Sequence, residues 1–595
     1  MAVIWIQVLL ISLLTVLGVD CQPKVALPGL GTLIGETVHF SRTEYPIIDT
    51  SVNIFKGIPY AEKPDRFAKP QAKVWSGEFD ATEFGAKCTQ PLEIDGTSED
   101  CLYLNVWAPS VKPSNAAVMV FFHGGGYLTG AGNSYNGLPL VAYNDIVYVS
   151  CNYRLNSFGF ISTGDAELPG NYGLWDQVEA LKWVKKYISE FGGDPNRVTI
   201  FGQSAGSGSV SMLTMGKPAW EYYDRAIAQS GSALSPWVIE LDQDKARQDA
   251  FEVGRNAGCN DTRSSADLAA CLRNVDEVRL RVATTLVIAK TRNVIPFVPV
   301  VDGEFITDNP INLLKRGEFK KSDFMTGTTR DEGSLLAARA FLRMLNDSDP
   351  FVNRTEFETK LGTYVYSYTN DLILNAVKQQ YVDWATADDP DTNFFETFVR
   401  ITTDEPFVCP TDAVARTYAA AGEDTYLYHM THVPSDRNFG ERVPWTGIVA
   451  HADELLFVFG FGLLPGRDKN ITAEEVSMTM DTMRYWTNFA KTGNPNTAYP
   501  NQADGVDDAK LWAQFTIPEL GYKEVAPAMR DQRALRSAQC RFWNEYIPQL
   551  VTLTGEMEEA EWQWREDFYN WRENDMAVWR QAYSEYMQMV EGGTV

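Results

Sequence analysis

A serine placed for nucleophilic chemistry stands in the segment Gly202-Gln203-Ser204-Ala205-Gly206. This G-x-S-x-G pattern directly follows the apolar run VTIF and precedes a stretch that is compatible with a helix. In such a strand-to-helix turn the glycines permit a tight bend, and the bend exposes the serine hydroxyl above the edge of a sheet. The pattern also occurs by chance, but its position after an apolar strand favours Ser204 as the nucleophile of an acyl transfer.

A glycine-rich loop lies upstream of this serine, where the apolar run VMVFF continues into His123-Gly124-Gly125-Gly126-Tyr127. Glycines after a strand leave backbone N–H groups free to point into a site, and acyl transfer requires such donors for the developing oxyanion. Folds with a serine elbow place this loop before the serine. An ordinary glycine loop is the alternative, and the presence of Ser204 disfavours it.

A serine nucleophile needs a general base, and the chain contains five histidines: His39, His123, His429, His432 and His451. Hydrolases with a serine elbow carry their groups in the order serine, acid, histidine, which removes the first two. His429 ends an apolar run and His432 follows it closely, so both are expected to be structural. His451 stands in a loop-like stretch before a predicted helix and is the best candidate for the base. Many carboxylates lie between the serine and His451, and position alone does not select the acid.

The elements that would position these groups alternate along the chain. Short β-branched apolar runs at 118–122, 146–150, 198–201 and 425–428 are typical of buried strands. Between two of them, residues 172–191 carry apolar side chains at helical spacing. Strands that alternate with helices form a mainly parallel sheet with helices on both faces. The sequence therefore predicts an α/β-hydrolase fold with a large mixed, mostly parallel sheet.

Domain boundaries and cellular location are suggested by the ends of the chain. Residues 1–21 form an almost unbroken apolar run that predicts a secretory signal peptide, with an uncleaved membrane anchor as the alternative. No internal repeat or low-complexity linker divides the chain after this run, so one catalytic domain is expected over residues 22–550. Sequons at Asn260, Asn346, Asn353 and Asn470 fit N-glycosylation of a secreted, extracellular protein.

The cysteines fit the same oxidising route, because thiols pair there. Two pairs are close enough in sequence for small disulfide loops, and Cys151 lies in the apolar run DIVYVSCNY, where a buried free thiol is expected. A third pair follows by elimination. The expected disulfides are Cys88–Cys101, Cys259–Cys271 and Cys409–Cys540.

The formal net charge of −26 argues against a nucleic-acid partner, because the phosphates would be repelled. Acidity of this size mainly implies solubility. It could also steer cationic substrates toward a negative cleft, but the charge alone does not distinguish the two effects.

The tail over residues 556–595 is dense in charge and in tryptophan. At about 100° per residue, one broad stripe contains the apolar residues Trp564, Phe568, Trp571, Val578, Trp579, Tyr583, Tyr586 and Val590. The opposite face carries Arg565, Glu566, Glu573 and Asn574. A lone amphipathic helix beyond a finished domain must dock on its own domain, on another copy or on a partner. Tryptophan and tyrosine are enriched at interfaces, which favours self-association.

The region from about residue 25 to 550 resembles the type-B carboxylesterase family, which includes cholinesterases and carboxyl ester lipases. The matching segments are SEDCLYLNVW, FFHGGGY, NYRLNSFGF, LPGNYGLWDQ, FGGDPNRVTIFGQSAG, FVPVVDGEF, TRDEGS and HADELLFVFG. The resemblance implies an esterase that needs no cofactor or metal, in which Glu332 is the triad acid and Asp331 its near neighbour. It also implies an oxyanion hole built from the N–H groups of Gly125, Gly126 and Ala205, and the expected disulfides match the cysteine pattern of the family.

The pocket residues implied by the resemblance differ from those of cholinesterases. Cholinesterases hold a quaternary ammonium with a tryptophan in the first disulfide loop, a phenylalanine just after the acid and a glutamate before the serine, and aromatic faces attract cations. Here the first disulfide loop has no aromatic residue, Leu335 and Leu336 follow the acid, and Gln203 precedes the serine. Ile295 and Phe297 stand where cholinesterases have bulky aromatics, and Trp237 matches a pocket tryptophan.

These differences predict a small-molecule ester that is neutral and fairly apolar as the substrate. Two alternatives stay open: a cholinesterase acting on acetylcholine or other choline esters, and a non-catalytic adhesion protein similar to neuroligins. The tail resembles the tryptophan amphiphilic helix by which some cholinesterases assemble around a proline-rich anchor. It therefore predicts a homo-oligomer, although the tryptophan spacing slips by one residue after Trp571.

Overall fold

The computed structural model describes residues 22–91, 95–260, 262–291, 295–367, 370–436, 443–467, 471–496 and 510–591. The predicted signal peptide and the sequon at Asn470 lie outside the described residues. Across the described part, no helix is both long and apolar enough to cross a membrane.

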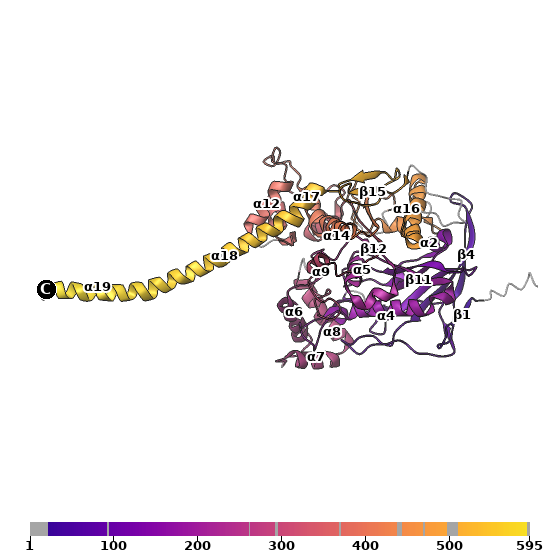
Figure 1. Cartoon of the computed structure of the whole chain (residues 1–595), viewed down its shortest axis with the longest axis horizontal. Coiled ribbons are helices and arrows are strands. Elements are labelled where there is room, and N and C mark those ends of the chain that lie inside the picture. Colours follow the sequence, from indigo (N-terminus) through magenta and orange to yellow (C-terminus); the bar gives the residue numbers. More distant parts are fainter. Residues whose placement is uncertain are drawn as a thin grey trace, which may run out of the picture.

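An eleven-stranded sheet forms the centre of the described chain, in the order β16-β15-β14-β13-β12-β11-β9-β10-β8-β4-β3 (Figure 1). Neighbours from β10 to β15 are parallel, whereas β3, β4, β8 and β16 join antiparallel at the two edges. The predicted α/β fold with a mixed, mostly parallel sheet is thereby confirmed. The strands are β3 (Glu36–Arg42), β4 (Ile48–Pro59), β8 (Tyr103–Pro109), β9 (Ala116–Phe122), β10 (Val147–Cys151), β11 (Gly193–Gln203), β12 (Arg225–Gln229), β13 (Phe324–Thr329), β14 (Thr425–Met430), β15 (Gly521–Val525) and β16 (Asp531–Arg533).

Two small sheets lie beside the large one. One of them has three strands, β1 (Lys24–Ala26), β2 (Thr32–Ile34) and β5 (Glu78–Asp80). The other pairs β6 (Lys87–Cys88) with β7 (Thr97–Ser98).

Strand β9 shows how the sheet separates two cores. Val118, Val120 and Phe122 pack into one buried cluster, and the alternating Met119 and Phe121 pack into another. Side chains of a strand point alternately to the two faces, so an unbroken apolar run such as VMVFF requires cover on both. Helices α4 and α5 contribute to the first cluster, and α2, α15 and α16 to the second.

The helices connect the strands and build a cap beside the sheet. The expected helix at 172–191 is α4, which ends at Tyr187 and continues as a 3₁₀ turn to Phe191. The helices are α2 (Leu138–Asn144), α3 (Asn156–Phe160), α4 (Tyr172–Tyr187), α5 (Ala205–Met215), α6 (Gln243–Asn256), α7 (Ser265–Asn274), α8 (Glu277–Lys290), α9 (Pro310–Arg316), α10 (Ser334–Ala340), α11 (Arg354–Tyr364), α12 (Asp371–Tyr381), α13 (Phe395–Thr403), α14 (Cys409–Ala420), α15 (Leu455–Val458), α16 (Ala473–Thr492), α17 (Ser537–Arg541), α18 (Ile547–Asn570) and α19 (Met576–Glu591).

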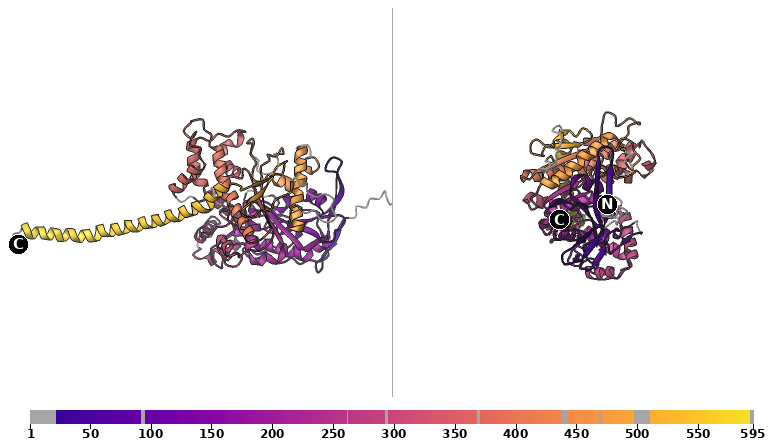
Figure 2. Two further views of the ribbon diagram at one scale, coloured as in Figure 1. Left: turned by 45° about the horizontal axis from the view of Figure 1, so that its top comes forward. Right: turned by 90° about the vertical axis from the view of Figure 1, so that its right-hand side faces the viewer.

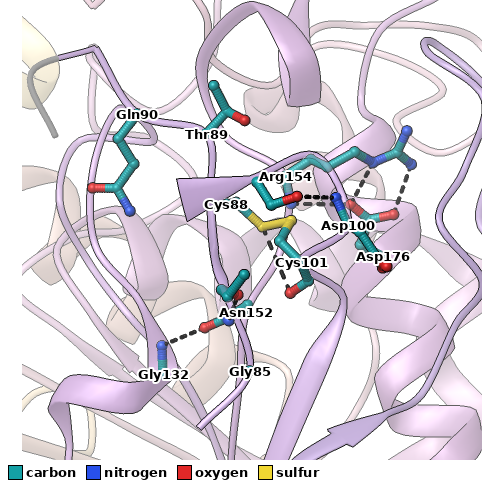
Figure 3. The surroundings of a disulfide bond; sticks show 12 residues. Gly85, Cys88, Thr89, Gln90, Asp100, Cys101, Gly132, Asn152, Arg154 and Asp176 are labelled. Atoms are coloured by element: carbon teal, nitrogen blue, oxygen red, sulfur yellow. Dashed lines mark hydrogen bonds and ion pairs between the residues drawn. A yellow bond between two sulfur atoms is a disulfide. The ribbon is translucent and has the colours of Figure 1, made fainter. Parts of the chain in front are cut away.

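The three expected disulfides are present, and Cys151 is a buried free thiol. Figure 3 shows the Cys88–Cys101 bond beside the buried ion pair of Arg154 and Asp176, whose nitrogen and oxygen lie 2.7 Å apart. A disulfide stabilises a fold mainly by restricting the unfolded chain. Gln90 follows Cys88 closely in the chain, and its amide contacts Gly130 in the loop after β9.

The sequons that the structure describes lie at the surface, since Asn260, Asn346 and Asn353 are all exposed. Asn353 also caps α11, because its side-chain oxygen accepts the backbone N–H of Glu356.

The tail helix extends away from the body that surrounds the large sheet instead of packing on it. The start of α18 contacts α12, and beyond it α18 and α19 extend away from the rest of the molecule (Figures 1 and 2). Trp564, Trp571 and Trp579 are 62%, 48% and 59% exposed. The side chains of Arg565, Glu566, Glu573 and Val590 are not among those that the structure describes.

A π-helical turn over Trp571–Asp575 joins α18 to α19. A π-bulge accommodates one extra residue in a helix. The π-turn lies between Trp571 and Trp579, where the tryptophan spacing is one residue too long. Because the turn takes up this extra residue, the two side chains share one face of the helix. The slip therefore does not break the stripe.

Candidate active site

Ser204 occupies a strained turn between the end of β11 and the start of α5. Its backbone has φ 57° and ψ −125°, an unfavourable conformation for a residue with a side chain. The flanking glycines leave no room for a Cβ: one on Gly202 would lie 2.4 Å from the carbonyl oxygen of Gly206, and one on Gly206 1.9 Å from that of Phe122. The chain thus folds here only with these glycines, and the turn carries Ser204 to the wall of a cavity.

Glu332 and His451 come together from separate loops. Oε2 of Glu332 lies 2.5 Å from Nδ1 of His451, and its Oε1 accepts the backbone N–H of Thr329 at 2.7 Å. Because a carboxylate only accepts hydrogen bonds, Nδ1 carries the proton and Nε2 is left as the acceptor. Both side chains are buried, at 0% and 4% exposure.

The neighbouring carboxylate is directed elsewhere. Oδ2 of Asp331 accepts hydrogen bonds from the guanidinium of Arg330 and from the backbone N–H of Val449, at 2.7 and 2.9 Å. The acid next to His451 is therefore Glu332.

Gln203 contacts the second nitrogen of the imidazole, Nε2. Its side-chain amide donates to Nε2 of His451 at 3.2 Å, and the amide itself is buried. Gln203 must release this nitrogen before His451 can take a proton from Ser204. The residue before the serine thus contacts the base directly and adds no charge to the site.

The glycine loop faces the serine with unpaired donors. Gly125 and Gly126 have φ of 111° and 63°, in the region that favours glycine. In the described part of the chain, the backbone N–H groups of Gly125, Gly126 and Ala205 have no hydrogen-bond acceptor. Ala205 is the first residue of α5, and the start of a helix attracts negative charge. Together these N–H groups are suited to hold an oxyanion.

Gln90 holds the loop after β9 in place through two hydrogen bonds to Gly130, which follows the glycine-rich segment. Its amide nitrogen donates to the carbonyl oxygen of Gly130 at 2.6 Å, and its amide oxygen accepts the N–H of the same residue at 3.0 Å. Asn152 holds Gly132 through a further bond of 2.8 Å (Figure 3). Sequence reasoning missed both residues, because a long-range contact between an amide and a backbone group leaves no local pattern.

A second buried carboxyl group lies near the Glu332–His451 pair. Burial raises the pKa of Glu454 to about 8, and the negative charge of Glu332 adds to the effect, while His451 opposes it. Gln229 donates to Glu454 at 3.1 Å and accepts from the indole N–H of Trp486 at the same distance. At neutral pH Glu454 is therefore protonated, so it adds no second negative charge beside the histidine.

The cavity above Ser204 has a volume of about 410 Å³, and polar and apolar side chains both line it. Trp237, Ile295, Leu335 and Leu336 line it together with Ser204 and His451. Phe297, also expected in the pocket, is instead 2% exposed within the core and is not among the lining residues.

Further wall residues were not anticipated: Phe407, Tyr366 and Arg339. Phe407 lies in the π-turn over Asp404–Val408, with its ring centroid 5.3 Å from that of His451 and 5.5 Å from that of Trp237. A π-turn is found frequently at functional sites, but its position cannot be inferred from composition.

The other four histidines either pair with carboxylates outside the site or are buried and neutral. His39 pairs with Asp49 at the surface, and His432 contacts Glu475 at 3.0 Å. Burial lowers the pKa of His123 to about 4 and that of His429 to about 3, which keeps both rings neutral. Within the described residues, no group of three or more histidine, cysteine, aspartate or glutamate side chains could hold a metal ion.

Comparisons with known proteins agree with this geometry. A model of the carboxylesterase family matches residues 22–543. The chain is 35% identical to an acetylcholinesterase of Bungarus fasciatus, over 91% of this chain and 90% of that protein. It is 33% identical to a cholinesterase of Mus musculus, over 92% of both chains. An acetylcholinesterase of Danio rerio is 34% identical over 91% of this chain and 92% of that protein.

Proposed function

Since the chain belongs to the carboxylesterase family and is a carboxylic ester hydrolase, we propose that Ser204, His451 and Glu332 form its catalytic triad. The observation that carries this proposal is the placement of the serine elbow, the His451–Glu332 pair and the unpaired N–H groups around one cavity. None of these groups alone would suffice, because esterases need nucleophile, base and oxyanion donors within reach of one carbonyl carbon.

The reaction then runs in two halves. Nε2 of His451 takes the proton of Ser204 as the oxygen attacks the ester carbonyl, and the N–H groups of Gly125, Gly126 and Ala205 bind the oxyanion. Glu332 orients the imidazole and stabilises its cation. His451 returns the proton to the departing alcohol, which leaves an acyl group on Ser204. Water repeats the sequence, releasing the acid and restoring the serine.

We propose a neutral, fairly apolar ester as the substrate. The support is the apolar part of the lining, which is formed by Trp237, Ile295, Leu335, Leu336 and Phe407. Among the lining residues that the structure describes there is no carboxylate to hold an ammonium group. A cation would lose its water there without an anionic partner.

A matched pair of substrates tests this selectivity. Butyrylcholine and its dimethylbutyl analogue, in which carbon replaces the ammonium nitrogen, have nearly the same shape. We expect kcat/KM for the neutral ester to equal or exceed that for butyrylcholine, and a neutral butyrate to be preferred to acetylcholine. A cation–π site contributes up to about 2 kcal/mol, so a choline preference of tenfold or more would contradict the proposed pocket.

Cholinesterase activity is the second candidate, because the relatives that share about a third of their residues with this chain bear that name. The same substrate pair decides between the two. An adhesion protein would instead hydrolyse none of these esters. The retained Ser204, Glu332 and His451 favour catalysis over that alternative.

Secretion is also proposed. The apolar run at 1–21, the three disulfides and the exposed sequons support an extracellular, glycosylated protein.

We further propose that the tail forms a homo-oligomer, with a proline-rich segment as a candidate anchor. The aromatic stripe that includes Trp564, Phe568 and Trp571 is exposed on a helix that leaves the body, so its own domain does not cover it. A stripe of this kind marks an interaction site, because large apolar patches rarely stay in water.

Removing residues 556–595 should therefore convert the oligomer to monomers in sedimentation, with ester hydrolysis retained. A sharper variant replaces Trp564, Trp571 and Trp579 with Gln, and Asn574→Ala serves as its control. A full-length protein that is monomeric at micromolar concentration, with or without a proline-rich peptide, would contradict the assembly role.

A further inference from the structure

Arg339 is a charged residue at the mouth of the proposed active site. It belongs to α10, which begins two residues after Glu332, and it lines the same cavity as Ser204. Ser204 is 9% exposed, whereas Arg339 is solvent-exposed, so the guanidinium lies toward the rim and the serine toward the floor.

No ion pair or side-chain hydrogen bond involves Arg339 within the described part of the chain. Nearby arginines are paired: Arg330 contacts Asp331, and Arg343 contacts Glu356 at 2.6 Å. Unlike these two arginines, Arg339 has no described carboxylate of its own chain to neutralise it, so its guanidinium is available to a ligand in the cavity. A guanidinium offers up to five donors in a planar fork that matches carboxylates and phosphates.

The rest of the wall bears no formal negative charge. Of the described lining residues, Arg339 is the one with a permanent charge, and none is an aspartate or a glutamate. Leu335, Leu336 and Phe407 line the same cavity with apolar side chains. A ligand complementary to these three apolar side chains and to Arg339 has an apolar body and a negative outer end.

We infer that Arg339 is a specificity residue that binds an anionic group at the far end of an otherwise apolar ester. The inference rests on the proposed ester hydrolysis and adds to it a class of substrate, namely esters that carry a carboxylate away from the scissile bond. The same charge disfavours choline esters, because it repels a second cation at the rim.

The test compares matched esters that differ in one charge. On the acyl side, the p-nitrophenyl monoester of pimelate is compared with p-nitrophenyl heptanoate. On the alcohol side, carboxyphenyl butyrate is compared with phenyl butyrate. For each pair the readout is the ratio of kcat/KM, anionic ester over neutral ester, in wild type and in Arg339→Gln.

In at least one pair the ratio should fall about tenfold in Arg339→Gln, the loss expected for one charge-assisted hydrogen bond. Arg339→Lys should restore part of it, since the charge remains without the fork. Arg343→Gln is the matched control: it removes the same charge four residues further on and should leave the ratio unchanged.

An unchanged ratio in Arg339→Gln for both pairs would overturn the inference, and so would an equal fall in Arg343→Gln, which would indicate a general effect of net charge. These outcomes are distinct from failure of the proposed function. In that case wild type would hydrolyse neither the neutral nor the anionic esters.

Discussion

Ser204→Ala is expected to lower ester hydrolysis by about 10⁵-fold or more, because it removes the atom that forms the acyl-enzyme. The remaining activity would come from binding and from the oxyanion donors alone. The fold should be unaffected, since the strained turn depends on Gly202 and Gly206 and not on the hydroxyl group. The measurement is kcat/KM on a p-nitrophenyl ester, beside the thermal unfolding curve.

Ser211→Ala is the matched control for this variant. Ser211 lies on the same helix, α5, is buried, and its hydroxyl has no hydrogen-bond partner in the described structure. It should retain hydrolysis close to wild type. If Ser204→Ala keeps the turnover of Ser211→Ala, another nucleophile performs the reaction.

Glu332→Gln is expected to lower kcat by roughly 10⁴-fold, the loss typical of replacing a triad carboxylate with its amide. The amide nitrogen can donate to Nδ1 of His451, which moves the ring proton to Nε2 and leaves no base for Ser204. The imidazolium formed in the reaction also loses its negative neighbour. KM should change little, because Glu332 is fully buried behind the histidine and does not line the cavity.

Asp331→Asn is the matched control for Glu332→Gln, because it removes a neighbouring carboxylate that does not contact His451. Asp331 contacts Arg330 and the backbone of Val449, so its replacement is expected to alter stability more than catalysis. A fall in kcat for Asp331→Asn as large as that for Glu332→Gln would contradict the assignment of the acid.

The central elements of the fold could be predicted from sequence because their signals are local. Apolar runs such as 118–122 and 198–201 fall within β9 and β11, and the helical spacing after Tyr172 appears as α4. The strands β15 and β16, the last two at one side of the sheet, were not predicted. They are short and mix polar with apolar residues, so pairing with neighbours defines them more than composition does.

In the candidate site too, some residues could be predicted from local sequence and others could not. The surroundings of Ser204 and the glycine loop are set by residues close in sequence. Gln90 and Glu454 act through contacts that only the folded chain creates, and Arg339 reaches the cavity only in the folded chain, so no local pattern marks these residues. Phe297, a position carried over from the family, is buried in the core and is not among the residues that line the cavity.

Covalent labelling of Ser204 by a fluorophosphonate probe tests the proposed mechanism most directly. Such a probe reacts with a serine only when a base activates it and oxyanion donors hold the product. Peptide mass spectrometry of the labelled wild-type protein should place a single adduct on Ser204, and Glu332→Gln should slow its formation by orders of magnitude. An adduct on another residue, or no adduct in a protein that hydrolyses esters, would contradict the account.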